Sequence, residues 1–191
     1  TFGTYTGQLE NGLPNGYGIL KYNIGGNYKG YWKNGLRQGK GKLTYYNGAI
    51  YVGDWENDFK QGKGRLTNDD GSIYDGSWLN GKKNGEGKYY YPDGDLYEGQ
   101  WLNNEKHGIG ILTFDDGTVY DGDWKHGKMD GDGIIKYPDN DVYEGKFENN
   151  KRNGWGKLIE YNDKGEIVNS FEGNWLNDEP DETSITNPEL S

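Results

Sequence analysis

A tyrosine recurs at every twenty-third position along most of the chain, and a glycine follows each of these tyrosines two positions later. The series comprises Tyr5, Tyr28, Tyr51, Tyr74, Tyr97, Tyr120 and Tyr143. A fixed period of this length is typical of repeat proteins, in which each unit buries its apolar face only against its neighbours. The chain is therefore expected to fold as one array of similar units.

Each unit has the sequence features of a β-hairpin. A Tyr-x-Gly-x-Trp segment is followed by a loop and then by Gly-x-Gly-x-Leu-x-Tyr, as in residues 28–45. Both segments alternate with period two, which favours strands, and dipeptides such as Asn34-Gly35 and Asn47-Gly48 favour tight turns. The alternation predicts one face of aromatic residues and glycine and one mostly polar face.

Glycine weakens the interior of a strand and there usually marks the close approach of another group. The recurring strand glycines are therefore expected to lie beside large aromatic rings. The expected register pairs Trp32 with Gly41, Gly30 with Leu43 and Tyr28 with Tyr45.

Composition limits the type of core. Only 31% of the residues are hydrophobic and 34 of 191 are glycine, yet 15% are aromatic. An aliphatic two-layer core is therefore not expected, and the aromatic content argues against disorder. The sequence predicts an all-β fold, an elongated single-layer antiparallel β-sheet of tandem hairpins that twists into a rod.

The repeats resemble the MORN (membrane occupation and recognition nexus) repeat, through blocks such as Tyr97-Glu-Gly-Gln-Trp101 and Lys106-His-Gly-Ile-Gly110. The resemblance extends from Tyr5 to about Asn177. It implies a protein similar to cytoskeletal scaffolds, radial spoke head proteins and junctophilins. It also matches regulatory segments of plant phosphatidylinositol phosphate kinases and of a lysine methyltransferase.

Three segments are expected. Residues 1–4 match the end of a truncated preceding repeat, 5–177 form seven repeats plus a half repeat, and 178–191 form an acidic, mostly disordered tail. Five extra residues lie within 162–170. The third repeat has Asp58 in place of the usual glycine and Asn68 in place of the returning tyrosine, which predicts a thinner aromatic face there.

The function expected from these features is a non-catalytic scaffold that binds a protein partner, in a cytoskeleton- or membrane-associated complex. A single-layer sheet should leave its rings partly open as a groove, and exposed apolar surfaces of this kind mark interaction sites. The expected partner-binding residues are Tyr28, Trp32, Tyr51, Trp55, Tyr74, Trp78, Tyr97, Trp101, Tyr120, Trp124, Tyr143 and Phe147.

The usual parts of catalytic and metal sites are not found in the sequence. There is no cysteine, and the two histidines, His107 and His126, occupy unlike repeat positions. We therefore expect no enzyme activity, no cofactor and no metal site. A net charge of -10 argues against nucleic-acid binding. The cysteine-free sequence, without a signal peptide or membrane span, favours the cytoplasm.

Charge is unevenly distributed along the chain, which supports an alternative function. Residues 28–50 carry five basic and no acidic residues, whereas 97–142 carry ten acidic and four basic residues. Lys29, Lys33, Lys40 and Lys42 could bind phosphoinositides or other anionic lipids, or could instead pair with acids on neighbouring strands. A second alternative, implied by the family resemblance, is a regulatory segment of a larger enzyme. An unpaired first strand also predicts either upstream repeats or a homo-oligomer.

The elongated architecture predicts the result of small-angle scattering. Two strands per repeat at about 4.8 Å give an array about 70 Å long. We expect a radius of gyration above roughly 20 Å, whereas a compact chain of this length would give about 16 Å. A measured value close to that of the compact chain would contradict the rod.

Overall fold

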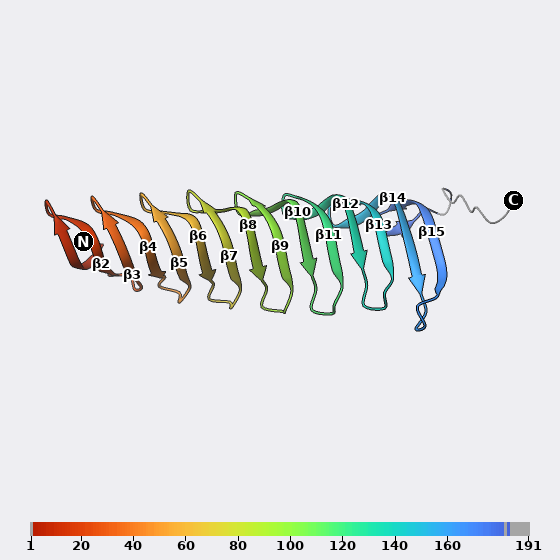
Figure 1. Ribbon diagram of the computed structural model, residues 1–191, viewed down its shortest axis with the longest axis horizontal. Coiled ribbons are helices and arrows are strands. Elements are labelled where there is room, and N and C mark those ends of the chain that lie inside the picture. Colours follow the sequence, from red (N-terminus) through yellow and green to blue (C-terminus); the bar gives the residue numbers. More distant parts are fainter. Residues whose placement is uncertain (1, 182, 184–191) are drawn as a thin grey trace. The chain divides into compact units, whose positions relative to one another are not determined.

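The computed structural model describes residues 2–181 and 183. These residues form one antiparallel β-sheet of sixteen strands that lie in the sheet in the order of the chain (Figure 1). The all-β prediction from tandem hairpins is thus confirmed. Within these residues, no helix has the length and apolar character needed to span a membrane.

The sheet strands are short, and most have seven or nine residues. In chain order they are β1 (Gly3–Glu10), β2 (Leu13–Tyr22), β3 (Asn27–Lys33), β4 (Leu36–Thr44), β5 (Ile50–Glu56), β6 (Phe59–Thr67), β7 (Ile73–Leu79), β8 (Lys82–Tyr90), β9 (Leu96–Leu102), β10 (Glu105–Thr113), β11 (Val119–Lys125), β12 (Lys128–Lys136), β13 (Val142–Glu148), β14 (Lys151–Tyr161), β15 (Ile167–Leu176) and β16 (Glu179–Pro180). The chain divides into two compact units, one of Thr1–Pro92 with Trp101–Asn104 and one of Asp93–Gln100 with Glu105–Ser191. Each unit is considered by itself.

The turn inside each hairpin has the geometry that its sequence favours. Asn34 and Gly35 have φ angles of 50° and 82°. Positive φ at both central residues belongs to the two-residue type I′ turn, whose twist matches that of the flanking strands. The Asn-Gly dipeptide therefore sets the position of this chain reversal, and pairs such as Asn57-Asp58 and Asn103-Asn104 adopt the same positive φ angles in other repeats.

The expected register of the hairpins is wrong. Tyr28 pairs with Leu43 and Gly30 with Gly41, and a bulge then shifts the pairing. Trp32 faces Gly16 of the preceding repeat, not Gly41. The rings do lie against glycines, but the tryptophan uses a glycine of the repeat before its own.

The two glycines of each Gly-x-Gly have different physical roles. Gly39 has a φ of 68°, a left-handed conformation that suits glycine at the strand bulge. Gly41 has an ordinary backbone but no room for a side chain. A Cβ there would lie 2.2 Å from the hydroxyl oxygen of Tyr28, whose ring covers it. This close approach requires glycine wherever the tyrosine recurs.

The core is a ladder of aromatic rings packed edge to face. Tyr28 contacts Trp32 of its own repeat and Trp55 of the next, with ring centroids 5.0 and 5.4 Å apart. Edge-to-face packing at this separation is favourable because the ring edge is positive and the ring face negative. The same alternation continues through β5 and β7 in the first unit and through β11 and β13 in the second.

The third repeat compensates for its two departures. Asp58 has a φ of 70°, and its carboxylate accepts hydrogen bonds from the backbone N–H and the guanidinium of Arg37. Asn68 bonds to buried Ser72, and Tyr89 of β8 also donates to the Ser72 hydroxyl. A polar cluster therefore occupies the place where the sequence predicted only a thinner aromatic face.

The five extra residues lengthen one hairpin. β14 continues to Tyr161, and β15 starts at Ile167. The turn between them is closed by a hydrogen bond from the Asn162 N–H to the Glu166 carbonyl. This hairpin reaches beyond the others in its unit (Figure 1). Trp175 of β15 is buried and donates its indole N–H to the Gly156 carbonyl.

The acidic segment from residue 178 begins as ordered structure, contrary to the expected disorder. Asp178 accepts a hydrogen bond from the Arg152 N–H, and β16 pairs with the end of β15. Asp178 thus has the role in the eighth unit that Asp58 has in the third. The prediction for residues 182 and 184–191 lies outside the described residues.

The close approach at the second glycine predicts a large effect of one methyl group. Gly133→Ala should lower the free energy of unfolding by about 1 to 3 kcal/mol, because the new Cβ would overlap the Tyr120 ring. Urea unfolding followed by tryptophan fluorescence measures this loss.

The matched control is Gly127→Asn in the same unit. A Cβ at Gly127 meets no atom within 4 Å, and Asn104 and Asn150 already occupy the equivalent position of other repeats. Its free energy of unfolding should change by no more than about 0.5 kcal/mol. Equal effects of the two substitutions would contradict the proposed steric role.

Candidate functional site

The aromatic row that the sequence predicted as an open groove is buried. The six repeat tyrosines from Tyr28 to Tyr143 are 0% exposed. The tryptophan or phenylalanine that follows each of them four residues later is 3–7% exposed. The prediction of partial opening is therefore wrong for Tyr28, Trp32, Tyr51, Trp55, Tyr74, Trp78, Tyr97, Trp101, Tyr120, Trp124, Tyr143 and Phe147. A partner would have to open the chain to reach these rings.

The polar atoms of the buried rings find backbone partners. The Tyr74 hydroxyl donates to the Ser77 carbonyl at 2.8 Å, across the strand bulge. The Trp78 indole N–H donates to the Gly64 carbonyl at 2.9 Å. Buried hydroxyl and indole groups need such partners, and the same two bonds recur in the other repeats. These contacts fix each ring in the core.

A row of basic side chains covers the rings. Arg37 lies over the Trp55 ring at 4.1 Å, and Lys60 lies over Trp78 at 4.3 Å. Lys83, Lys106 and Arg152 cover the corresponding tryptophan of the next repeat in the same way. Cations are attracted to the negative face of such rings, and their aliphatic stems shield the rings from water.

The ammonium of Lys60 lies close to three rings, those of Tyr45, Tyr51 and Trp78. Lys83 has a similar environment formed by Tyr74, Tyr89 and Trp101. Burial lowers the pKa of Lys60, Lys83 and Lys106 to about 8. The two arginines of the row are instead held by carboxylates.

Arg37 pairs with Asp58 and Arg152 with Asp178, and these arginines are the first and last cations of the row along the chain. Pro14 and Met129 replace the cation at this repeat position in the first and sixth repeats. Sequence analysis missed the basic row. The available signal was the recurrence of Arg or Lys at one position of the repeat, and no local pattern connects it with a ring in the following repeat.

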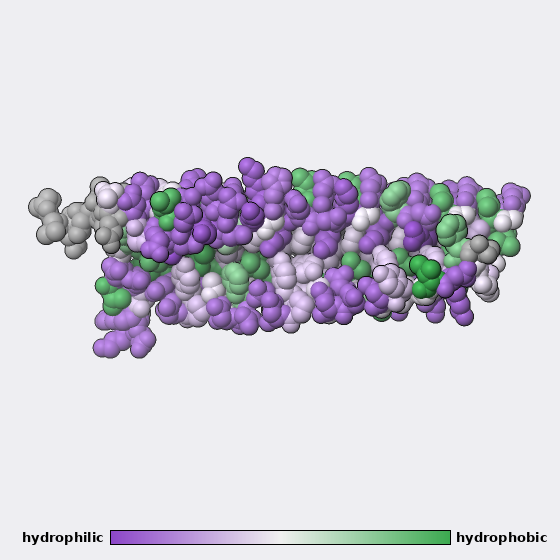
Figure 2. Space-filling view, turned by 180° about the vertical axis from the view of Figure 1, so that it is seen from behind, coloured by the Kyte–Doolittle hydropathy of each residue, from purple (hydrophilic) through white to green (hydrophobic). Residues whose placement is uncertain are grey.

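The opposite face of the sheet carries several large apolar side chains that remain exposed. Tyr17, Ile109 and Trp155 share one repeat position and are 50%, 62% and 49% exposed. Sequence analysis predicted a polar face opposite the rings and did not single out these residues. Figure 2 shows the side of the molecule that is turned away in Figure 1, where hydrophilic residues predominate and hydrophobic residues form smaller patches.

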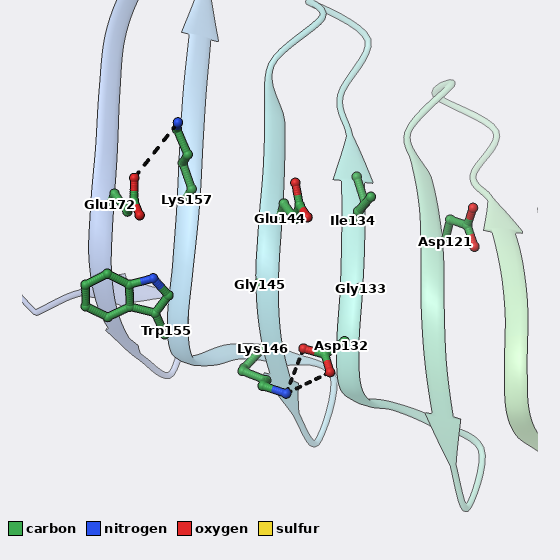
Figure 3. Close-up of a pocket in the computed structure, with 10 residues that line it drawn as sticks. All are labelled: Asp121, Asp132, Gly133, Ile134, Glu144, Gly145, Lys146, Trp155, Lys157 and Glu172. Atoms are coloured by element: carbon green, nitrogen blue, oxygen red, sulfur yellow. Dashed lines mark hydrogen bonds and ion pairs between the residues drawn. The ribbon is translucent and has the colours of Figure 1, made fainter.

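Each unit has a hollow on this face with paired glycines in its floor. The hollow of the second unit has a volume of about 640 Å³, and Gly133 and Gly145 lie between the side chains that form its walls. Figure 3 shows Ile134, Glu144 and Trp155 around it. Lys146 pairs with Asp132 at 2.7 Å, and Lys157 lies 3.9 Å from Glu172.

The hollow of the first unit has a volume of about 510 Å³ and a more basic lining. Its floor includes Gly30, Gly41, Gly53 and Gly64. Its walls include Tyr17, Lys29, Tyr31, Lys40, Val52, Lys63, Arg65 and Asp75. The Tyr17 and Tyr31 rings meet edge to face, with centroids 5.6 Å apart.

The four lysines predicted to contact lipid do not form one group. Lys29 and Lys42 are direct cross-strand partners, whereas Lys40 forms an ion pair with Asp54. Lys33 lies beside the hairpin turn, opposite Leu36. Pairing with an acid on a neighbouring strand therefore applies to one lysine of the four. Their contact with lipid remains a prediction.

The described residues contain no group of three or more His, Cys, Asp or Glu side chains placed to hold a metal ion. His107 and His126 lie near each other, with ring centroids 6.3 Å apart, and His126 Nδ1 is 3.1 Å from Glu105 Oε2. His126 is exposed at a hairpin turn, and His107 is half-buried in β10.

Comparison with known families finds seven consecutive matches to the family described as MORN repeat. They cover residues 5–27, 28–50, 51–73, 74–96, 97–119, 120–142 and 143–159. No curated protein matches the chain significantly.

Solved structures of similar type include the TCP domain of Drosophila melanogaster SAS-4 (dCPAP), in complex with a proline-rich motif of Ana2. It is 15% identical, with a TM-score of 0.49 and coverage of 80% of this chain and 82% of that chain. The TCP10 domain of Danio rerio CPAP is 12% identical, with a TM-score of 0.26 and coverage of 80% and 98%. With TM-scores below 0.5, these likenesses carry no argument about function.

The ring-covered lysines predict an unusual dependence of stability on pH. Their pKa is about 8 in the folded chain, against about 10.4 for an unfolded lysine. Between these pH values the unfolded chain binds more protons, so the free energy of unfolding should rise with pH.

Above about pH 10 the trend should reverse, because unfolded tyrosines ionise near that pH. Burial raises the pKa of Tyr143 to about 12 and raises the pKa of Tyr28, Tyr51, Tyr74 and Tyr120 as well. Thermal unfolding measured from pH 7 to 11 should therefore show a maximum between about pH 9 and 10. Replacing Lys60, Lys83 and Lys106 by Met, the residue at the equivalent position 129, should remove the rise but retain the fall. A wild-type chain without a rise would contradict this account.

Proposed function

Because the chain belongs to the MORN repeat family, we propose that it is a non-catalytic scaffold whose exposed sheet face binds a protein partner. The face in question is opposite the buried rings and includes Tyr17, Tyr31, Ile109 and Trp155. The observation that carries the proposal is that large apolar side chains remain exposed there around the glycine-floored hollows. Exposed aromatic residues among polar ones are characteristic of protein interfaces.

The buried row and the exposed face have different roles in this proposal. The rings, their glycines and the covering cations stabilise the array, and their polar atoms are already bonded. In neither unit do the described residues form a second layer over the other face. Its charged side chains alternate with Ile, Val, Tyr and Trp, so a partner would gain both apolar contact and hydrogen bonds.

The finer assignment follows the family resemblance alone. On that ground we propose that the partner belongs to a cytoskeleton- or membrane-associated complex in the cytoplasm. A role as the regulatory segment of a larger enzyme is compatible with the same surface, since a repeat array would then bind another domain of its own protein.

Site-specific photocrosslinking tests the proposal. Benzoylphenylalanine is introduced in place of Tyr31, Ile109 or Trp155 on the exposed face, in cells that express the chain. The controls replace Leu79 or Leu102, which are also exposed but end their strands beside hairpin turns. We expect the face positions to capture a shared protein that the tip positions do not capture.

Rebinding of the purified captured protein completes this test. It should bind wild-type chain in solution and bind a Tyr31→Ser and Trp155→Ser variant at least tenfold more weakly. Capture of the same protein at the face positions and at the control positions beside the turns would contradict the proposal. Capture of no protein at any of these positions would contradict it as well.

A further inference from the structure

The exposed face of the first unit carries an uncompensated pair of like charges, Lys29 and Lys42, and Lys29 lines the hollow. Lys29 of β3 and Lys42 of β4 are direct cross-strand partners, with exposed side chains on the same face. Their next cross-strand neighbours are Ile19 and Val52, which carry no charge. Like charges directly opposite each other destabilise a sheet, so this pair needs an explanation.

No acid in the described residues compensates this pair. Within residues 2–181 and 183, neither ammonium forms an ion pair, whereas neighbouring Lys40 and Arg65 pair with Asp54 and Asp75. Charged residues at equivalent positions elsewhere face an opposite charge or an apolar side chain. Examples are Asp75 with Lys88, Asp121 with Ile134 and Glu144 with Lys157. The Lys29 and Lys42 pair therefore differs from the pairs at the equivalent positions of the other repeats.

The surroundings of the pair favour a ligand that is both anionic and apolar. Lys29 lines the hollow together with Lys63, Val52 and the Tyr17 and Tyr31 rings. The paired glycines leave the floor without side chains, so backbone or small groups of a ligand can approach closely. The floor crosses the strands β3 to β6 at about 4.8 Å per strand, which is about 14 Å, or about four residues of extended chain.

We propose that this hollow binds an extended acidic polypeptide segment, with carboxylates at Lys29 and Lys42 and an aromatic or apolar side chain against Tyr17 and Tyr31. This inference deepens the proposed function by naming the class of partner, and it rests on that function. Two carboxylates would remove the repulsion between the lysines and form charge-assisted hydrogen bonds with them.

The shape and charge of the chain favour a peptide over a membrane. A bilayer reaches protruding side chains, whereas this site includes a floor of glycines below its walls. The whole chain carries a net charge of -10, which an anionic leaflet would repel. An extended peptide can enter the hollow and use the apolar wall as well as the lysines.

Fluorescence anisotropy with defined peptides tests the inference. The probe is a fluorescein-labelled decapeptide of alternating glutamate and tyrosine, and the comparison peptide has glutamine in place of glutamate. We expect the acidic peptide to bind at least tenfold more tightly than the glutamine peptide. Its affinity should fall when the salt concentration rises from about 50 to about 300 mM, because screening weakens exposed ionic contacts.

The decisive variant replaces Lys29 and Lys42 by Gln, and it should weaken binding of the acidic peptide at least tenfold. The matched control replaces Lys125 and Lys128 by Gln, since these are also direct cross-strand partners but lie beside a hairpin turn of the second unit. The control should leave the affinity unchanged within about twofold. Circular dichroism and tryptophan fluorescence confirm that both variants retain the fold.

Several results would overturn the inference. These are equal binding of the two peptides, equal losses in both variants, or no binding of the acidic peptide at low salt. Vesicles containing phosphatidylinositol 4,5-bisphosphate and sedimentation of the chain alone are measured in parallel. Dependence of vesicle binding or self-association on Lys29 and Lys42, without peptide binding, would identify a membrane or a second copy instead. Shared crosslinks on the exposed face without peptide binding would leave the proposed function standing and remove only this inference.

Discussion

The close approach of paired glycines is the constraint on which the rest of the structure depends. Gly30 and Gly41 are direct partners, and a Cβ on Gly30 would lie 2.6 Å from the Gly41 Cα. The space that side chains would fill is taken by the Tyr28 ring. Because Gly41 also pairs with Gly53 of the next repeat, the glycines form a continuous row across β3 to β8. The tyrosine therefore recurs with the glycines.

The glycine row explains how one sheet buries an aromatic core without a second layer. Each tyrosine lies over its glycine and packs edge to face against two rings of the ladder. A basic or other long side chain from the preceding hairpin then covers the ring, and its charge is favoured by the ring face. Burial of the cation is tolerated because the covering group keeps partial contact with water and gains the attraction of up to three rings.

The same row separates stability from binding. Residues on the ring side are fixed by packing and by hydrogen bonds to backbone carbonyls, so they cannot change freely. Residues on the other side face only the glycine floor and can differ between repeats. The first unit has a basic lining with Lys29 and Lys63, and the second has an acidic lining with Glu144 and Glu172. One backbone arrangement thus presents two chemically different surfaces.

The sequence by itself determined the repeat, the hairpins, the turns that contain Asn-Gly and the gathering of the aromatic rings on one face. These follow from period-two alternation and from the φ preferences of Asn and Gly, which are local properties. Only the tertiary structure decided the register, because the left-handed glycine at position 39 creates a bulge that moves Trp32 away from Gly41. The tertiary structure also decided that the aromatic rings are buried and that the opposite face of the sheet is exposed. The covering cation and its ring belong to successive repeats, as Arg37 and Trp55 do, and their contact depends on the path of the backbone between those repeats.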